Sequence, residues 1–198
     1  MSHHDAIMDA GESLIKLLEQ NIKEDTDTYS VFKPENAIIL SSPDELNSND
    51  KKISLFLYNI IENSYLRNQN EYIPDSNNKN SPLNLSLFYL ITPHTESIQN
   101  DQILLGKILQ IFHDNAILRG SVLQGSLTGQ ELRLILNHFS VDELNKLWSI
   151  VSGSKPYKLS ICIEVTPVRI DSTKEQKVIR VIERDLEYTV PGEVHDND

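Results

Sequence analysis

The strictest pattern in the chain is an alternation of apolar and polar side chains over residues 157–170. The apolar series consists of Tyr157, Leu159, Ile161, Ile163 and Val165. Successive side chains of a β-strand point to opposite faces, so this alternation predicts a strand with one buried face. A chain with such a strand has to build a sheet and cover it with other elements.

Two more strands are expected on either side of a polar insert. Residues 53–61 form a near-continuous apolar run, which is typical of a strand covered on both faces. Residues 83–92 alternate leucine, tyrosine and isoleucine with other residues and predict a second core strand. The stretch between them, residues 62–82, is rich in Asn and Ser and has too few aliphatic residues to bury itself. We interpret it as a functional or disordered loop.

Three segments have helical periodicity. Residues 5–23 and 101–117 carry apolar residues at intervals of three and four, and Asp101 suits the positive end of a helix dipole. Ser140 and Glu143 form a capping box at the start of a third helix. The remaining segments predict a short strand at residues 31–40, a flexible glycine-rich connector at 120–129 and a strand at 131–139.

This order of elements predicts an α/β (α+β) fold with a mixed, mostly antiparallel sheet and helices packed on it. The chain has 198 residues, a length that suits one domain. We expect a single domain over residues 1–170, with the polar insert at about 64–82. An extended arm and tail would follow over residues 171–198.

Within that arm, residues 177–190 have strand propensity but carry charges on both faces. One face presents Val178, Arg180, Ile182, Arg184, Leu186, Tyr188 and Val190. The other face ends in Glu183, Asp185 and Glu187, which favours a solvated or partner-facing edge over a calcium site. Two interpretations stay open: the segment pairs within its own sheet, or it adds a strand to the sheet of a neighbour.

Composition excludes some classes of partner. The formal net charge is −11, with 29 acidic against 18 basic residues, so nucleic acid and anionic membranes are not expected to bind. No apolar stretch approaches the roughly 20 residues that span a bilayer, and the start of the sequence shows no signal peptide. The single cysteine fits a reducing interior, so we expect the chain to be made and folded in a cytosol.

No catalytic residue, metal site or cofactor site is predicted. The six histidines lack paired metal-ligand spacing, and Cys162 alternates with apolar residues without a partner that would stabilise a thiolate. Gly120, Gly125 and Gly129 are not followed by the Lys-Ser/Thr that a phosphate-binding loop requires. The chain is therefore not expected to be an enzyme.

Five segments in fixed order resemble the tail terminator, or cap, proteins of extracellular contractile injection systems, the phage-tail-like particles of the antifeeding prophage and Photorhabdus virulence cassette types. The segments are residues 55–68, 81–93, 104–118, 140–148 and 157–170. The resemblance implies a homo-oligomeric ring, a hexamer, that terminates the inner tube and contacts the last sheath layer. Such a particle can be released from the cell.

The same resemblance points to Asn63, Arg67 and Asn68 as protein-interface residues, with Arg67 as a contact between subunits. The alternative is that Arg67 is a surface residue paired with a nearby acidic side chain. Two other functions stay open: a stand-alone adaptor domain that binds partners by strand addition, and a small hydrolase or metal enzyme whose residues are scattered along the sequence.

Overall fold

The computed structural model describes residues 4–46, 51–66, 78–79, 81–151, 155–173 and 175–176. Its α-helices are α1 (Ala6–Glu24), α2 (Thr26–Val31), α3 (Ile98–Asp114) and α4 (Val141–Val151). Three short 3-10 helices are η1 (Pro43–Glu45), η2 (Gly120–Val122) and η3 (Gly125–Leu127). The strands are β1 (Ile38–Ile39), β2 (Lys52–Glu62), β3 (Asn78–Lys79), β4 (Leu83–His94), β5 (Ile117–Leu118), β6 (Leu132–Asn137), β7 (Ile161–Ile170) and β8 (Glu175–Gln176).

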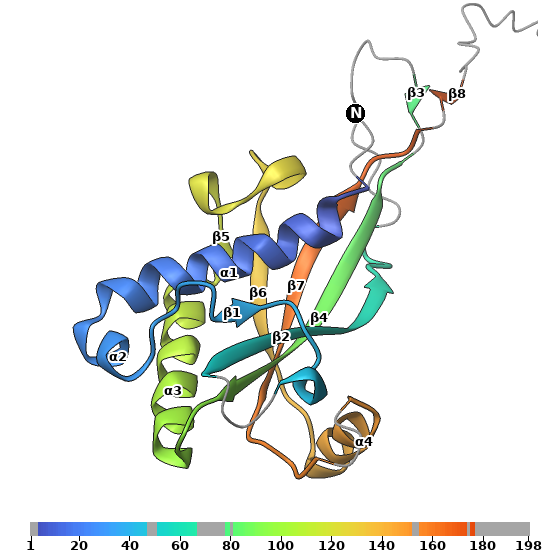
Figure 1. Ribbon diagram of the computed structural model, residues 1–198. Coiled ribbons are helices and arrows are strands. Elements are labelled where there is room, and N and C mark those ends of the chain that lie inside the picture. The colour runs from blue at the N-terminus through green and yellow to red at the C-terminus, as the bar shows by residue number, and fades with distance from the viewer. Residues whose placement is uncertain are drawn as a thin grey trace, which may run out of the picture.

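The strands form a six-stranded sheet in the order β1-β2-β4-β7-β6-β5 (Figure 1). β1 runs parallel to β2, and the other neighbours are antiparallel. This confirms the predicted α+β class with a mixed, mostly antiparallel sheet. β3 and β8 pair separately as a short ladder beyond the ends of β4 and β7.

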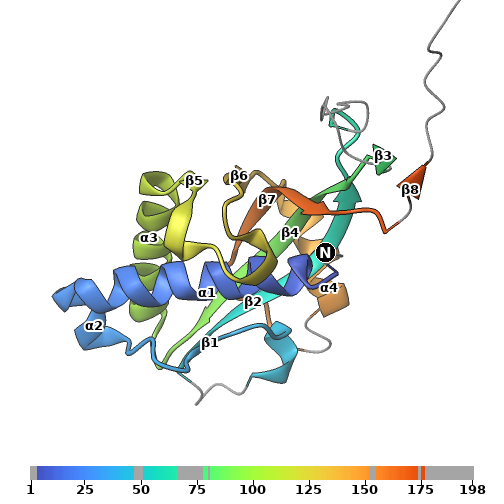
Figure 2. The same cartoon turned by 90° about the horizontal axis from the view of Figure 1, so that it is seen from above.

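Helices cover the two faces of the sheet unequally, as Figures 1 and 2 show together. α1 and α3 bury one face, where Leu14 and Ile108 belong to the same apolar core as Leu87 of β4. The opposite face has a smaller core, in which Trp148 of α4 packs with Cys162 of β7. The sheet therefore separates a large core from a small one.

Alternation in β4 and β7 explains how one sheet serves both cores. Leu87 and Tyr89 face the large core, whereas Leu90 belongs to the small one. In β7, Ile163 and Val165 face the large core, and Cys162 lies on the other side. The alternation predicted in the sequence is present from Ile161 onward, because side chains of neighbouring residues emerge on opposite faces of a strand. The prediction was wrong for residues 157–160, which precede the strand and leave Tyr157 and Leu159 half exposed, and for the single buried face, since Cys162 is buried as well.

The segment between α1 and β2 differs from the prediction. A strand was expected over residues 31–40, but Thr26–Val31 is a helix and only Ile38–Ile39 pairs with β2. Asp25 starts this helix, since its Oδ1 accepts a hydrogen bond from the Thr28 N–H at 2.8 Å. The N-cap at Asp25 accounts for the helix at Thr26–Val31, and the expected strand is reduced to Ile38–Ile39.

Asp25 also joins α2 to α3, because its Oδ2 lies 2.6 Å from Lys107 Nζ. The bonds from Lys107 and Thr28 lower the pKa of Asp25 from 3.8 to about 2. A carboxylate whose pKa is lower in the folded state stabilises the fold at pH above its unfolded pKa. We expect this contribution to be lost as the pH falls from about 4 to about 2. Urea unfolding at several pH values would measure it.

Asp25→Asn is the matched variant for this prediction, since asparagine caps a helix as well as aspartate but carries no charge. The variant should lose the dependence of unfolding free energy on pH between about 4 and 2 that is due to residue 25. An identical pH profile for Asp25→Asn and the unmodified chain would show that Lys107 does not stabilise the folded carboxylate.

The glycine-rich stretch of residues 120–129 is the second difference. It was expected to be a flexible connector, but η2 and η3 are folded against α1. Ser126 donates hydrogen bonds from its N–H and Oγ to Asp9 Oδ2, at 2.8 and 2.6 Å. The Gln124 N–H donates to Ser13 Oγ at 2.9 Å. Asp9 and Ser13 of α1 thus accept the backbone hydrogen bonds that a neighbouring strand would otherwise accept, and this holds the loop in place.

Candidate functional site

The described residues do not bring the histidines together with other metal-ligating side chains. Within them, no group of three or more His, Cys, Asp or Glu residues could hold a metal ion. His94 is buried at the end of β4, whereas His113 and His138 are exposed on α3 and after β6. None of the helices in the described ranges combines the length and the apolar character of a membrane span.

Cys162 lies in the small core between β7 and α4 and is 3% exposed. Burial raises the pKa of its thiol from 9.0 to about 12, so the thiol stays protonated at neutral pH. We expect the folded chain to react with iodoacetamide far more slowly than the chain unfolded in urea. The rate of alkylation, followed by mass spectrometry, measures this difference.

The contrary result would be equal alkylation rates in the folded and unfolded chain. It would mean either that α4 opens readily from the sheet or that the thiol is activated by a neighbour. A Cys162→Ala variant is the control for reaction at other side chains. This prediction follows from the packing of Cys162 in the small core.

Of the interface residues predicted from the sequence, Asn63 is the one that lies in the described part. Its N–H donates to the carbonyl of Asn84 at 2.8 Å, and its Nδ2 donates to Thr166 Oγ1 at 3.2 Å. Thr166 Oγ1 also accepts a hydrogen bond from Ser86 Oγ at 2.9 Å. Asn63 therefore anchors the end of β2 to β4 and β7, which gives it a positioning role.

The other predicted interface residues lie outside the described residues. They are Arg67, Asn68, Val178, Arg180, Ile182, Arg184, Leu186 and Tyr188. Their part in any interface stays a prediction, as does the arm formed by residues 177–190.

The β2 edge of the sheet is open over most of its length. β1 pairs only with Ile53 and Ser54, and no other described strand lies on that side of β2. Ile60 and Ile61 are 44% and 49% exposed. The prediction that residues 53–61 form a strand covered on both faces is thus wrong for its second half, because that half extends past the covering helices.

The opposite edge is open as well, along the second half of β6. β5 pairs with Leu132 and Arg133, and the Leu134 N–H donates to the Ala116 carbonyl at 2.9 Å. Ile135 and Leu136 follow with exposed side chains, and no described strand pairs with them on the β5 side. Unpaired N–H and C=O groups on such an edge can accept another strand.

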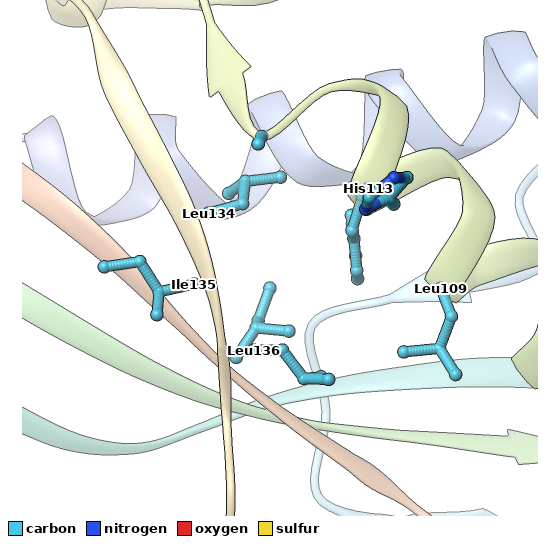
Figure 3. A pocket seen from close by; sticks show the side chains of 8 residues that line it. Leu109, His113, Leu134, Ile135 and Leu136 are labelled. Carbon is cyan, nitrogen blue, oxygen red and sulfur yellow. The ribbon is translucent and has the colours of Figure 1, made fainter.

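An apolar groove of about 180 Å³ lies beside this edge, between α3 and β6. In Figure 3, Leu109 and His113 of α3 lie on one side of it, and Leu134 and Leu136 of β6 lie on the other. We call these four residues and the space between them the α3–β6 groove. It holds no carboxylate, and its only titratable lining group is His113, which suits contact with an apolar side chain.

Sequence reasoning missed this groove. Leu136 alternates with Leu132 and Leu134, which predicted burial, yet it is 61% exposed. Leu109 was not assigned to the apolar stripe of its helix. The sequence signal that could have indicated the groove was Leu109 in α3 and Leu136 in β6, two leucines beyond those that the core requires.

The described geometry defines an α+β domain whose distinctive exposed features are two sheet edges and an apolar groove. The chain belongs to the Pvc16 N-terminal domain family, whose sequence pattern matches residues 9–184. No curated protein sequence is significantly similar to the chain.

Solved structures that share the fold include two from contractile injection particles. One is the sheath/tube terminator of an extracellular contractile injection system of the PVC type in its extended state: TM-score 0.59, 18% identity, 93% of this chain and 64% of that chain covered. The other is the tube-terminating cap of the anti-feeding prophage: TM-score 0.50, 21% identity, 86% and 59% covered. The chain thus spans less than two thirds of the length of either relative. The resemblance inferred from the sequence is confirmed.

Proposed function

We propose that this chain is the cap of a contractile injection particle, a ring that terminates the inner tube and contacts the last sheath layer. Membership of the Pvc16 N-terminal domain family over residues 9–184 supports this function. So does the fold shared with a sheath/tube terminator and a tube-terminating cap. In this role the chain is a structural protein and not an enzyme.

The observation that carries the proposal is the pair of open sheet edges. A closed ring needs a head-to-tail contact, in which each copy presents two different surfaces to its two neighbours. The outer sides of β2 and β6 lie toward opposite ends of the strand order and expose aliphatic side chains. A free monomer usually protects its edges with charges or covering loops. Edges of this kind suit a subunit that is covered on assembly.

The domain boundaries remain part of the proposal. Residues 1–170 would form the cap domain with its polar insert at about 64–82, and residues 171–198 would form the arm and tail. The proposal also includes synthesis in the cytoplasm and a ring of six copies. The ring would be released from the cell as part of the assembled particle. The adaptor alternative is not favoured, since the two solved structures described above are named as a terminator and a cap.

The direct test is the mass of the purified chain, alone and mixed with the tube and sheath proteins of the same particle. Native mass spectrometry should detect a closed oligomer, and negative-stain electron microscopy should show rings at tube ends. A chain that stays monomeric with both proteins present, or particles of normal length assembled without it, would contradict the cap function.

A further inference from the structure

The α3–β6 groove is large enough for one aliphatic side chain. Its volume is about 180 Å³, and an apolar cavity of about 150 Å³ is enough to bind benzene. Phe112, Ala116, Ile135 and Ile163 complete its lining, so the entering group would contact carbon on several sides. Exposed Leu136 borders the groove and would lose water contact when it is filled.

The backbone beside the groove is ready to accept a strand. The Leu134 N–H points to the β5 side, where the Ala116 carbonyl accepts it. Backbone groups alternate in direction along a strand, so the N–H and C=O of Leu136 point to that same side. β5 pairs no further than Leu132 and Arg133. An added strand would therefore continue the line of β5 and place a side chain over the groove.

The sequence of this chain contains a segment with matching chemistry. Val178, Ile182 and Leu186 recur at every fourth residue of the segment 177–190, with Arg180 and Arg184 between them on the same face. A strand with this pattern offers an aliphatic group to the groove and arginines on either side of it. The exposed Asp114 and the negative end of the α3 dipole lie next to the groove and favour those arginines.

The place where the segment leaves the domain favours a neighbouring copy as acceptor. β7 passes the groove at Ile163 and runs on to Ile170, and β8 follows at Glu175–Gln176. Figure 1 shows β8 beyond the end of β7, on the side away from α3. A residue in a strand advances about 3.3 Å, so residues 163–170 already carry the chain about 23 Å away. β8, the last described strand before the segment, therefore lies well away from the groove of its own copy.

From these observations, we infer that the α3–β6 groove of one copy binds the segment 177–190 of the next copy, which adds as a strand to the open side of β6. The inference rests on the ring in the proposed function and names the contact that closes it. It assigns Leu109 and Leu136 to the acceptor side, and Val178, Ile182 and Leu186 to the donor side. It also favours strand addition to a neighbour over pairing within the same sheet.

Disulfide trapping in the full chain tests the contact directly. Leu136→Cys in one preparation and Ile182→Cys in another, both in a Cys162→Ala background, are mixed and oxidised with copper phenanthroline. Val178→Cys and Leu186→Cys replace Ile182→Cys in parallel mixtures, because the register is set by the four-residue repeat. We expect at least one mixture to yield a covalent dimer of one donor and one acceptor chain.

Ile150→Cys is the matched acceptor control, since Ile150 is a 79% exposed aliphatic residue on α4, outside the groove. The inference is overturned if no donor position gives more dimer with Leu136→Cys than with Ile150→Cys. Leu136→Arg should also raise the dissociation constant of the oligomer about tenfold or more, whereas Ile150→Arg should leave it unchanged. Equal effects of these two arginine variants would count equally against the groove.

Failure of this contact can be told apart from failure of the cap function. Rings that form at tube ends without cross-linking keep the cap function and reject the groove as acceptor. Cross-linked dimers together with normal particles assembled without the chain keep the groove contact and reject the cap function. Cross-linking of the donor cysteines to sheath protein instead would assign the arm to the sheath and overturn the inference.

Discussion

Replacing Gly125 by alanine is expected to lower the free energy of unfolding by about 2–4 kcal/mol. Gly125 has φ = 50°, a conformation that disfavours any residue with a Cβ. A Cβ at this position would clash with the carboxylate of Asp9. The carboxylate could move aside only by giving up the hydrogen bonds from Ser126. Urea unfolding followed by circular dichroism measures the loss.

Gly129→Ala is the matched control, because Gly129 also has positive φ, at 83°, but no atom lies within 4 Å of its added Cβ. Backbone strain alone should cost this variant about 1 kcal/mol. The difference between the two variants reports the contact with Asp9. If both variants lose the same free energy, the loop does not depend on its attachment to α1.

Trp148→Ala is expected to detach α4 from the sheet and to cost about 3–5 kcal/mol in the stability of the small core. Trp148 is buried there with Leu90 and Cys162, and its ring packs edge-on against Tyr157 with centroids 5.3 Å apart. Its Nε1 donates to the Lys155 carbonyl at 3.3 Å. Removal of the indole therefore takes away both the packing and the bond that hold α4 to the following turn.

The expected loss is local, because the sheet separates the small core from the large one. Hydrogen exchange in Trp148→Ala should speed up in α4 while amides of α1 and α3 keep their protection. Ile108→Ala, a cavity in the large core, is the comparison and should speed exchange in α1 and α3. Uniform acceleration throughout the Trp148→Ala chain would show that the two cores unfold as one unit.

Much of the fold was predictable because its main elements carry their own periodicity. Four of the expected strands and the helices at α1, α3 and α4 exist, and the capping box is formed, with the Ser140 N–H 2.8 Å from Glu143 Oε2. The helix at Thr26–Val31 was missed because one hydrogen-bonding cap, rather than a repeating pattern, starts it. The ordered loop at residues 120–129 was missed because its partner, Asp9, is distant in sequence.

The candidate site was less predictable than the fold. Leu109 and Leu136 line one groove only because α3 packs beside β6, and periodicity says nothing of which helix meets which strand. The sequence did indicate protein contact as the class of function, through the charged strand that it predicts at residues 177–190 and through the resemblance to cap proteins. It could not indicate where on a partner that strand would bind.

The ladder of β2, β4 and β7 extends beyond the helices, and this sets how its far end keeps its position. Asn63, Ser86 and Thr166 hold one face of that end through hydrogen bonds, whereas Leu85 and Val168 on the other face belong to the large core. The direction of the three strands at that end is set by main-chain hydrogen bonds, which form in the same way with almost any side chain. The surface residues of this projecting end of the sheet can therefore be substituted to match a different neighbour without a change in the direction of the strands.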